Sequence, residues 1–109
     1  MTTSSYFAMP GVRKNPPHHE LIIKHVCEQY KITEEQIKRR CQDRWIIDPR
    51  HTAMYIIKKK HPKISLKRIG LMFGNYDHAT VLCAIRSMTN SIEVYDERGK
   101  KCLNILHSF

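Results

Sequence analysis

Helix start and stop signals recur so closely along this chain that only short helices fit between them. Four residues of the types that cap helices each precede an apolar segment: Thr33, Asp48, Ser65 and Asp77. Thr33 has Gln36 three residues later and two acidic residues between, which is the pattern of a capping box. Pro49 follows Asp48 directly, and proline is favoured in the first helical position. These signals predict an all-α fold, a compact bundle of about six short helices.

Apolar residues recur with helical spacing between these signals. The expected helices span residues 18–30, 33–40, 48–60, 65–73 and 77–89, and a short last helix follows a break near residues 95–99. Residues 41–48 are expected to form a loop whose Trp45, Ile46 and Ile47 fill the core. The expected apolar residues are Leu21, Ile22, Val26 and Tyr30, then Ala53, Met54, Ile56 and Ile57, then Leu66, Ile69, Leu71, Met72 and Phe73, then Val81, Leu82, Ile85, Met88 and Ile92, and finally Leu103, Ile105 and Leu106.

The N-terminal residues 1–17 differ from the rest in composition. They are rich in Thr, Ser, Pro and Gly and have no apolar periodicity. We expect a flexible arm over residues 1–17 and one helical domain over residues 18–109. The arm lacks the charged and apolar regions of a signal peptide, and no apolar run approaches the roughly 20 residues that span a bilayer. A cytosolic protein with no membrane partner is therefore expected.

The four cysteines lie far apart and form no C-x-x-C pair: Cys27, Cys41, Cys83 and Cys102. Two disulfides or a zinc site shared with histidines remain formal alternatives, but a reducing compartment disfavours the first and the absence of close ligand pairs disfavours the second. We expect buried free thiols and no metal or cofactor.

The net charge of +9 is concentrated in the middle of the chain. Residues 36–70 hold eleven basic and two acidic residues, whereas the remainder has equal numbers of each. A cationic region on a neutral body is typical of proteins that bind polyanions. A solvated basic face without a partner is the alternative.

The expected helices 65–73 and 77–89 have the spacing of a helix-turn-helix, because a short turn containing Gly74 joins them. In that motif the first residues of the second helix meet base edges in the major groove. Here those residues are Asp77, His78, Ala79 and Thr80. A carboxylate can accept from cytosine N4, an imidazole can bond a base edge, and methyl groups can touch thymine methyls. Asp77 can equally be a helix cap alone.

Two segments resemble one family in register. Residues 69–86, IGLMFGNYDHATVLCAIR, are similar to the signature of the C-terminal domain of the bacterial replication initiator DnaA, in which Ile-Gly, Phe-Gly and Asp-His-x-Thr-Val-Leu-x-Ala follow one another. Residues 49–54, PRHTAM, resemble the Pro-Arg segment of the same family. The resemblance extends over about residues 20–109. It implies a Trp-repressor-like domain of six helices, here as a stand-alone protein, that binds a short asymmetric duplex element, the DnaA box, without a small-molecule substrate. It also implies a location in the bacterial cytoplasm or nucleoid, with a phage-encoded protein as the alternative source.

The resemblance also implies roles for individual residues. Asp77, His78, Ala79 and Thr80 would read bases, and phosphate contacts would come from Arg50, Lys58 and Ser65, with Lys67 and Arg86 nearby. The family inserts an Arg from a basic loop into the minor groove, and here that position falls on Gln42. Either Arg40 or Arg44 substitutes for it, or the contact is lost. Tyr76 stands where the family has Arg, and Ala79 where it has Thr. These departures bear on the preferred sequence more than on DNA binding.

No phosphate-binding loop G-x-x-x-x-G-K-[ST] occurs in these 109 residues, and no arrangement of nucleophile, base and orienting group is evident. We therefore expect a non-enzyme without ATPase activity, monomeric on DNA, that regulates transcription or replication. Two alternatives stay open. The domain could instead dock on a protein partner through its basic face, or bind RNA or DNA without sequence preference.

Overall fold

A computed structural model describes residues 18–39 and 43–108, and these residues form six α-helices with no strand among them. The helices are α1 (His19–Tyr30), α2 (Glu34–Ile37), α3 (Arg44–Lys60), α4 (Leu66–Met72), α5 (His78–Val94) and α6 (Glu97–His107). The predicted all-α fold of six helices is confirmed. The expected arm over residues 1–17 lies outside the described residues.

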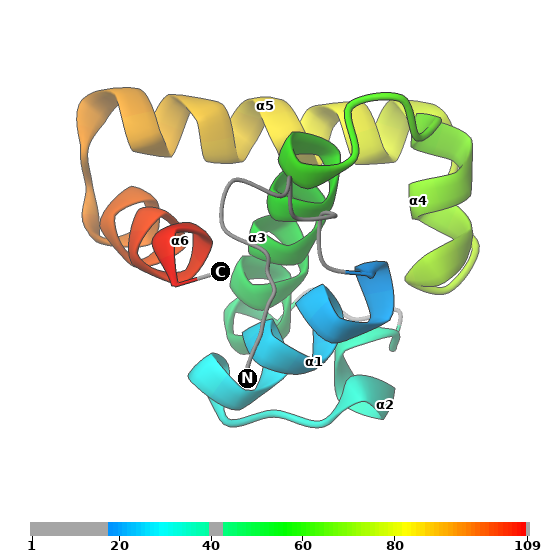
Figure 1. Cartoon of the computed structure of the whole chain (residues 1–109), viewed down its shortest axis with the longest axis horizontal. Helices are drawn as coiled ribbons and strands as arrows, with labels where there is room; N and C mark the ends of the chain where they lie inside the picture. Colours follow the sequence, from blue (N-terminus) through cyan, green and yellow to red (C-terminus); the bar gives the residue numbers. More distant parts are fainter. Residues whose placement is uncertain (1–17, 40–42, 109) are drawn as a thin grey trace, which may run out of the picture.

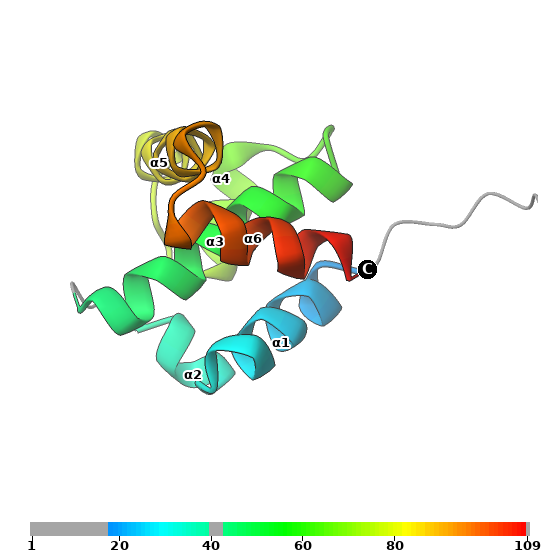
Figure 2. The same ribbon diagram turned by 90° about the vertical axis from the view of Figure 1, so that its left-hand side faces the viewer.

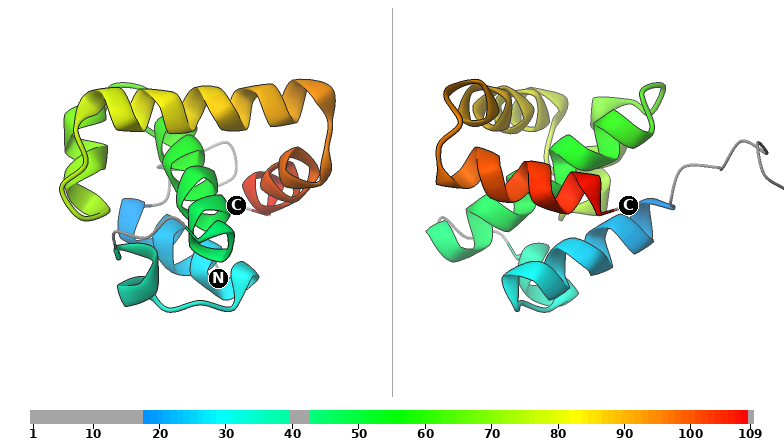
Figure 3. Two further views of the ribbon diagram at one scale, coloured as in Figure 1. Left: turned by 180° about the vertical axis from the view of Figure 1, so that it is seen from behind. Right: turned by 60° about the vertical axis from the view of Figure 1, so that its left-hand side comes forward.

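Helix α3 is the centre of the bundle, since it contacts α1, α2, α5 and α6. Figure 1 shows α5 along one side of the molecule, and Figure 2 shows α1 and α2 on the opposite side from it. Helix α5 crosses α3 near its middle, where Arg50 and Met54 of α3 line a small cavity together with Thr80 and Ala84 of α5. The view from behind in Figure 3 shows α4 beside the beginning of α5 and α6 beside its end. The predicted face Ala53, Met54, Ile56 and Ile57 is buried in the core, where each large aliphatic side chain contributes about 1.5–3 kcal/mol.

Local capping accounts for where most helices begin. The capping box of Thr33 and Gln36 is present in both directions, and the Ser65 hydroxyl accepts from the amide of Arg68. Asp96 caps α6 in the same way. Each such cap satisfies an amide that has no partner within the helix and is worth about 1 kcal/mol. Helix α2 ends at Ile37 and is therefore shorter than the predicted range of residues 33–40.

The predicted start of the third helix at Asp48 and Pro49 is wrong. Helix α3 begins at Arg44 instead, and the carbonyl oxygen of Asp43 accepts from the amides of Ile46 and Ile47. Pro49 therefore lies in the second turn, where it cannot donate to the carbonyl four residues back. Full burial of Ile46 in the added turn helps to offset that loss.

Several apolar side chains that the spacing assigned to the core are exposed. Helix α1 buries Ile22, Ile23, Val26 and Cys27, a stripe shifted by one position that fits the helical period as well as the predicted one. The corrected residues, with their exposed fractions, are Leu21 at 58%, Trp45 at 50%, Leu71 at 58% and Leu82 at 36%. Cys83 is also exposed, contrary to expectation, whereas Cys27 and Cys102 are buried free thiols as predicted.

Helix α5 continues past residue 89 to Val94, up to the predicted break near residues 95–99, and Tyr95 terminates it in the left-handed conformation with φ of 58°. The turn to α6 is correspondingly short. Gly99, assigned to the break, lies in α6, and a Cβ there would overlap the carbonyl oxygen of Ser91. Glycine is therefore what allows α6 to pack closely on α5.

A polar cluster around Arg98 joins α6 to α3 and α5. Its guanidinium lies 2.9 Å from the carboxylate of Asp48 and 3.1 Å from Nδ1 of His51. It also donates to the hydroxyl oxygens of Ser87 and Ser91. Because arginine has only donors, Nδ1 of His51 accepts, which requires the neutral imidazole with its proton on Nε2. Burial, together with the smaller effects of the Arg98 and Arg50 charges, lowers the pKa of His51 to about 4.

This cluster predicts a pH-dependent loss of stability. His51 binds a proton near pH 6.5 when the chain is unfolded but only near pH 4 when it is folded. The unfolded state therefore gains protons first, and stability falls as the pH drops from about 6.5 to about 4. Allowing for partial solvent exposure, the loss is about 2 kcal/mol.

His51→Asn keeps an acceptor for Arg98 but does not titrate, so the free energy of unfolding of this variant is expected to change less over this pH range in urea titrations. His107→Asn, at an exposed position, is the control. Equal slopes in the wild type and His51→Asn would contradict the assignment.

Candidate nucleic-acid interface

The first turn of α5 presents small and polar residues to solvent. Asp77, the N-cap, accepts a hydrogen bond on Oδ1 from the amide of Thr80 at 2.8 Å, and this confirms its capping role. Asp77, His78, Ala79 and Thr80 are all exposed. The four residues predicted to read bases therefore lie together at one accessible helix end, where the helix dipole adds positive potential.

The turn before α5 fixes the direction in which this end points. The amide of Tyr76 donates to the carbonyl oxygen of Gly70 at 3.0 Å. A Cβ on Gly70 would overlap the carbonyl oxygen of Tyr76, so only glycine allows α4 to approach the turn this closely. Gly74 and Asn75 take φ of 107° and 69°, the left-handed region that glycine and asparagine adopt most readily. The predicted turn at these two residues is confirmed.

From its first turn onward, α5 exposes a continuous stripe, which we call the α5 face. Its members are His78, Ala79, Leu82, Cys83, Arg86 and Asn90. The opposite side buries Val81, Ala84 and Met88. Leu82 and Cys83 were missed as surface residues, although each lies four positions after a predicted base-reading residue and so shares its side of the helix. Between residues 66 and 90 only Asp77 is acidic, which favours contact with a polyanion.

Arg50 lies inside the protein, and only 5% of its surface is exposed. Its Nη1 donates to the hydroxyl oxygen of Tyr76 at 2.6 Å, and the guanidinium carbon lies 4.9 Å from the centre of the Tyr76 ring. Nη1 also donates to the carbonyl oxygen of Arg39. Arg50 thus connects α3 to the turn that precedes α5. Arg50, Tyr76 and Thr80 line a cavity of about 210 Å³ beside the start of α5.

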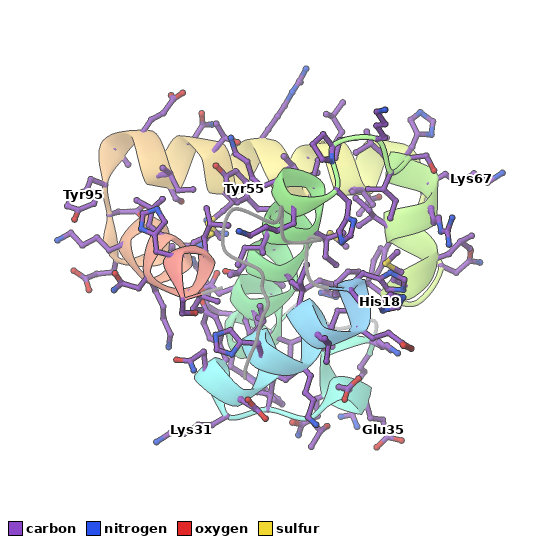
Figure 4. The ribbon with its side chains drawn as sticks, in the orientation of Figure 1. His18, Lys31, Glu35, Tyr55, Lys67 and Tyr95 are labelled. Atoms are coloured by element: carbon purple, nitrogen blue, oxygen red, sulfur yellow. The ribbon has the colours of Figure 1, made fainter. Side chains whose placement is uncertain are left out.

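The other residues predicted to contact phosphates differ in whether their side chains bond to groups of the protein itself. Nζ of Lys58 donates to the carbonyl oxygens of Pro62 at 2.9 Å and Ile64 at 2.7 Å, so it holds the loop between α3 and α4 in place. Lys67 is exposed and extends outward from α4, on the side away from the bundle (Figure 4). Ser65 is exposed at the start of α4, and Arg86 lies on the α5 face.

Arg44 is not brought together with Lys58. It lies at the other end of α3 from Lys58, roughly 21 Å away at 1.5 Å per helical residue. Its side chain is 77% exposed and only 3.9 Å from the Asp48 carboxylate, a weak surface pair. Arg40 and Gln42 lie outside the described residues.

The described residues hold no cluster of three or more His, Cys, Asp or Glu side chains able to bind a metal ion. Within residues 18–39 and 43–108 no helix combines the length and the apolar character required to cross a bilayer. The arrangement is that of a surface for recognition: an exposed helix end, a positioned turn and cations on three neighbouring elements.

Comparison with known proteins identifies relatives of this chain. Residues 19–88 match the family described as the bacterial dnaA protein helix-turn-helix. The chain is 38% identical over 82 residues to the chromosomal replication initiator protein DnaA of Chlorobaculum tepidum, a match that covers 75% of this chain and 16% of that protein. It is also 38% identical to the DnaA proteins of Rippkaea orientalis over 67% and of Zymomonas mobilis over 72% of this chain. The matched segment spans about 16% of the length of each of these relatives.

The contact between Arg50 and Tyr76 predicts the effect of removing one hydroxyl. Tyr76→Phe leaves the part-buried Arg50 guanidinium without the acceptor 2.6 Å away, and the expected loss in free energy of unfolding is about 1–2 kcal/mol. Tyr95→Phe, at a 61% exposed position, is the matched control and should change stability by less than about 0.5 kcal/mol. Urea denaturation of both variants measures this. Equal effects in the two would show that the Arg50 contact does not stabilise the turn.

Proposed function

The chain belongs to the bacterial DnaA helix-turn-helix family, and from this premise we propose that it binds double-stranded DNA at a short specific sequence through the start of α5. The observation that carries the proposal is the exposed first turn of α5, capped by Asp77 and directed outward by the turn at Gly70. A helix end of this kind fits the major groove, which is wide enough to admit an α-helix.

Base readout is the role of the first two turns of α5. Asp77 accepts from a cytosine amino group, and His78 bonds a base edge. The methyl groups of Ala79 and Thr80 contact thymine methyls, as does Leu82, which lies one turn after His78 on the same face. The site is an asymmetric element similar to a DnaA box, read by a monomer. Tyr76 and Ala79, where the family has Arg and Thr, alter its preferred sequence.

Phosphate contacts fix the position of the duplex and carry most of its salt dependence. Lys67, Ser65 and Arg86 contact phosphates directly, and Lys58 does so with the N–H that the loop carbonyls leave available. Arg50 acts as a positioning residue through Tyr76. Arg40, or Arg44 at the start of α3, reaches the minor groove.

In the cell such a protein regulates replication or transcription at initiator-type sites, in the bacterial cytoplasm or nucleoid, and without ATP hydrolysis. No phosphate-binding loop for a nucleotide occurs in the 109 residues. The proposal therefore concerns DNA recognition alone, and the origin-melting activity of a full initiator is not part of it.

Selection from a random duplex library, followed by sequencing at two salt concentrations, tests this function. The proposal predicts one enriched motif and an affinity that falls steeply with salt. Enrichment of no sequence, with tight binding retained, would instead indicate binding without sequence preference. Failure to retain any duplex would favour a domain that docks on a protein partner.

His78→Ala tests base readout residue by residue. On the selected duplex the variant should lose about 1–3 kcal/mol of binding free energy, because one base contact is removed. On a scrambled duplex of the same length its affinity should be unchanged, because phosphate contacts remain. His107→Ala, exposed near the end of α6, is the matched control and should bind both duplexes normally. Fluorescence anisotropy measures all four affinities, and equal losses by His78→Ala on both duplexes would contradict readout by this helix.

A further inference from the structure

A second concentration of positive charge lies apart from the α5 face. The start of α1, the loop between α3 and α4, and α4 itself enclose a pocket of about 510 Å³. Six of its lining residues are basic or imidazole side chains: His18, His19, Lys60, His61, Lys63 and Arg68. None of the described residues that line it is acidic. We call it the α1–α4 pocket.

The charges of this pocket act on one another. Burial lowers the pKa of His19, and the neighbouring charges of His18, Arg68 and His61 lower it further, against an opposing effect of Glu20. The Glu20 carboxylate lies 3.7 Å from Nδ1 of His18. The pocket therefore has a positive potential that one nearby acid only partly offsets, and an anion would lower its electrostatic free energy.

The walls of the pocket are held in place by contacts within the protein. Lys58 fixes the loop through the carbonyl oxygens of Pro62 and Ile64, both of which belong to pocket-lining residues. His18 accepts from the amide of Glu20 on Nδ1 at 3.2 Å, so its neutral ring carries the proton on Nε2 and remains a donor. Figure 4 shows His18 at the start of α1, in the region between α1 and α4. Donors arranged in this way need little reorganisation to bind an anion.

The pocket is continuous with the DNA-binding elements. Lys63 precedes Ser65 by two residues, and Arg68 follows Lys67 on α4. Figure 2 shows α5 and the loop between α3 and α4 along the same upper side of the molecule. A duplex seated on the α5 face and on the start of α4 would therefore continue toward this loop.

We propose that the α1–α4 pocket binds a backbone phosphate of the duplex beyond the base pairs that α5 reads. The inference rests on the proposed function, because it assigns a further contact to the same DNA. Lys63 and Arg68 supply the charge, and the histidines supply neutral or charged donors. The contact carries no base information, so it strengthens binding to every duplex that is long enough to reach it.

The test neutralises the pocket and compares duplexes. Lys63→Gln with Arg68→Gln should weaken binding about ten-fold at low salt, equally on selected and scrambled duplexes, and should reduce the salt slope by about 1–2. Shortening the duplex on the flank nearest α4 should abolish the difference between variant and wild type. Lys100→Gln with Lys101→Gln removes the same charge from exposed positions on α6 and should change the slope much less.

The outcomes separate this inference from the proposed function. If the library yields no motif, sequence readout fails, yet the salt slope on any duplex still tests the pocket. Equal slopes for the two double variants would overturn the pocket assignment even with base readout intact.

Inorganic phosphate and a mononucleotide, titrated without DNA and followed by NMR, test whether a free phosphate is the ligand of the pocket. Binding of either that requires Lys63 and Arg68, together with unchanged duplex affinity, would overturn the DNA assignment. Circular dichroism of both double variants verifies that they fold.

Discussion

Gly70 sets the geometry on which the candidate interface depends. A side chain there would overlap the carbonyl oxygen of Tyr76, so the crossing of α4 and α5 requires this residue to have none. The approach also lets the Gly70 carbonyl accept from the Tyr76 amide, which closes the turn. Arg50 then holds Tyr76 from the side of α3. Together these contacts hold the start of α5 on a rigid part of the bundle, which suits a surface that must match a groove.

The basic residues fall into two groups with different tasks. Arg50, Lys58 and Arg98 donate to groups of the protein itself and so position the turn, the loop and α6. Lys67, Arg86, Lys63 and Arg68 are exposed and can meet phosphates. A concentration of basic residues in the sequence therefore does not mean that every one of them is available to contact a phosphate. Substitutions in the first group should alter stability along with binding, whereas those in the second should alter binding and its salt dependence.

Local signals in the sequence predicted much of the fold, and the failures have physical causes. The caps at Thr33, Ser65 and Asp77 are confirmed, because each requires only a side chain and an amide three residues away. The predicted start of α3 was wrong because the helix begins before the Asp48–Pro49 signal, with an additional turn that buries Ile46. Periodicity alone does not decide whether a residue at the edge of an apolar stripe is buried, so Leu21 and Leu82 were wrongly assigned to the core. The grouping of residues 77–80 followed from spacing, whereas the burial of Arg50 and the α1–α4 pocket depend on contacts distant in sequence.

The central claim is that the α5 face enters the DNA groove, and Cys83 offers the most direct measurement of it. Cys83 is exposed on this face, whereas burial raises the pKa of Cys27 to about 11 and of Cys102 to about 12, which keeps both thiols unreactive. With Cys41 replaced by Ser, iodoacetamide labelling should be confined to Cys83 and slow at least about ten-fold when the selected duplex is saturating. A cysteine introduced by Val94→Cys at a 72% exposed position, with Cys83→Ser, should label at the same rate with and without DNA. Unchanged labelling of Cys83 in the bound complex would show that DNA contacts another surface.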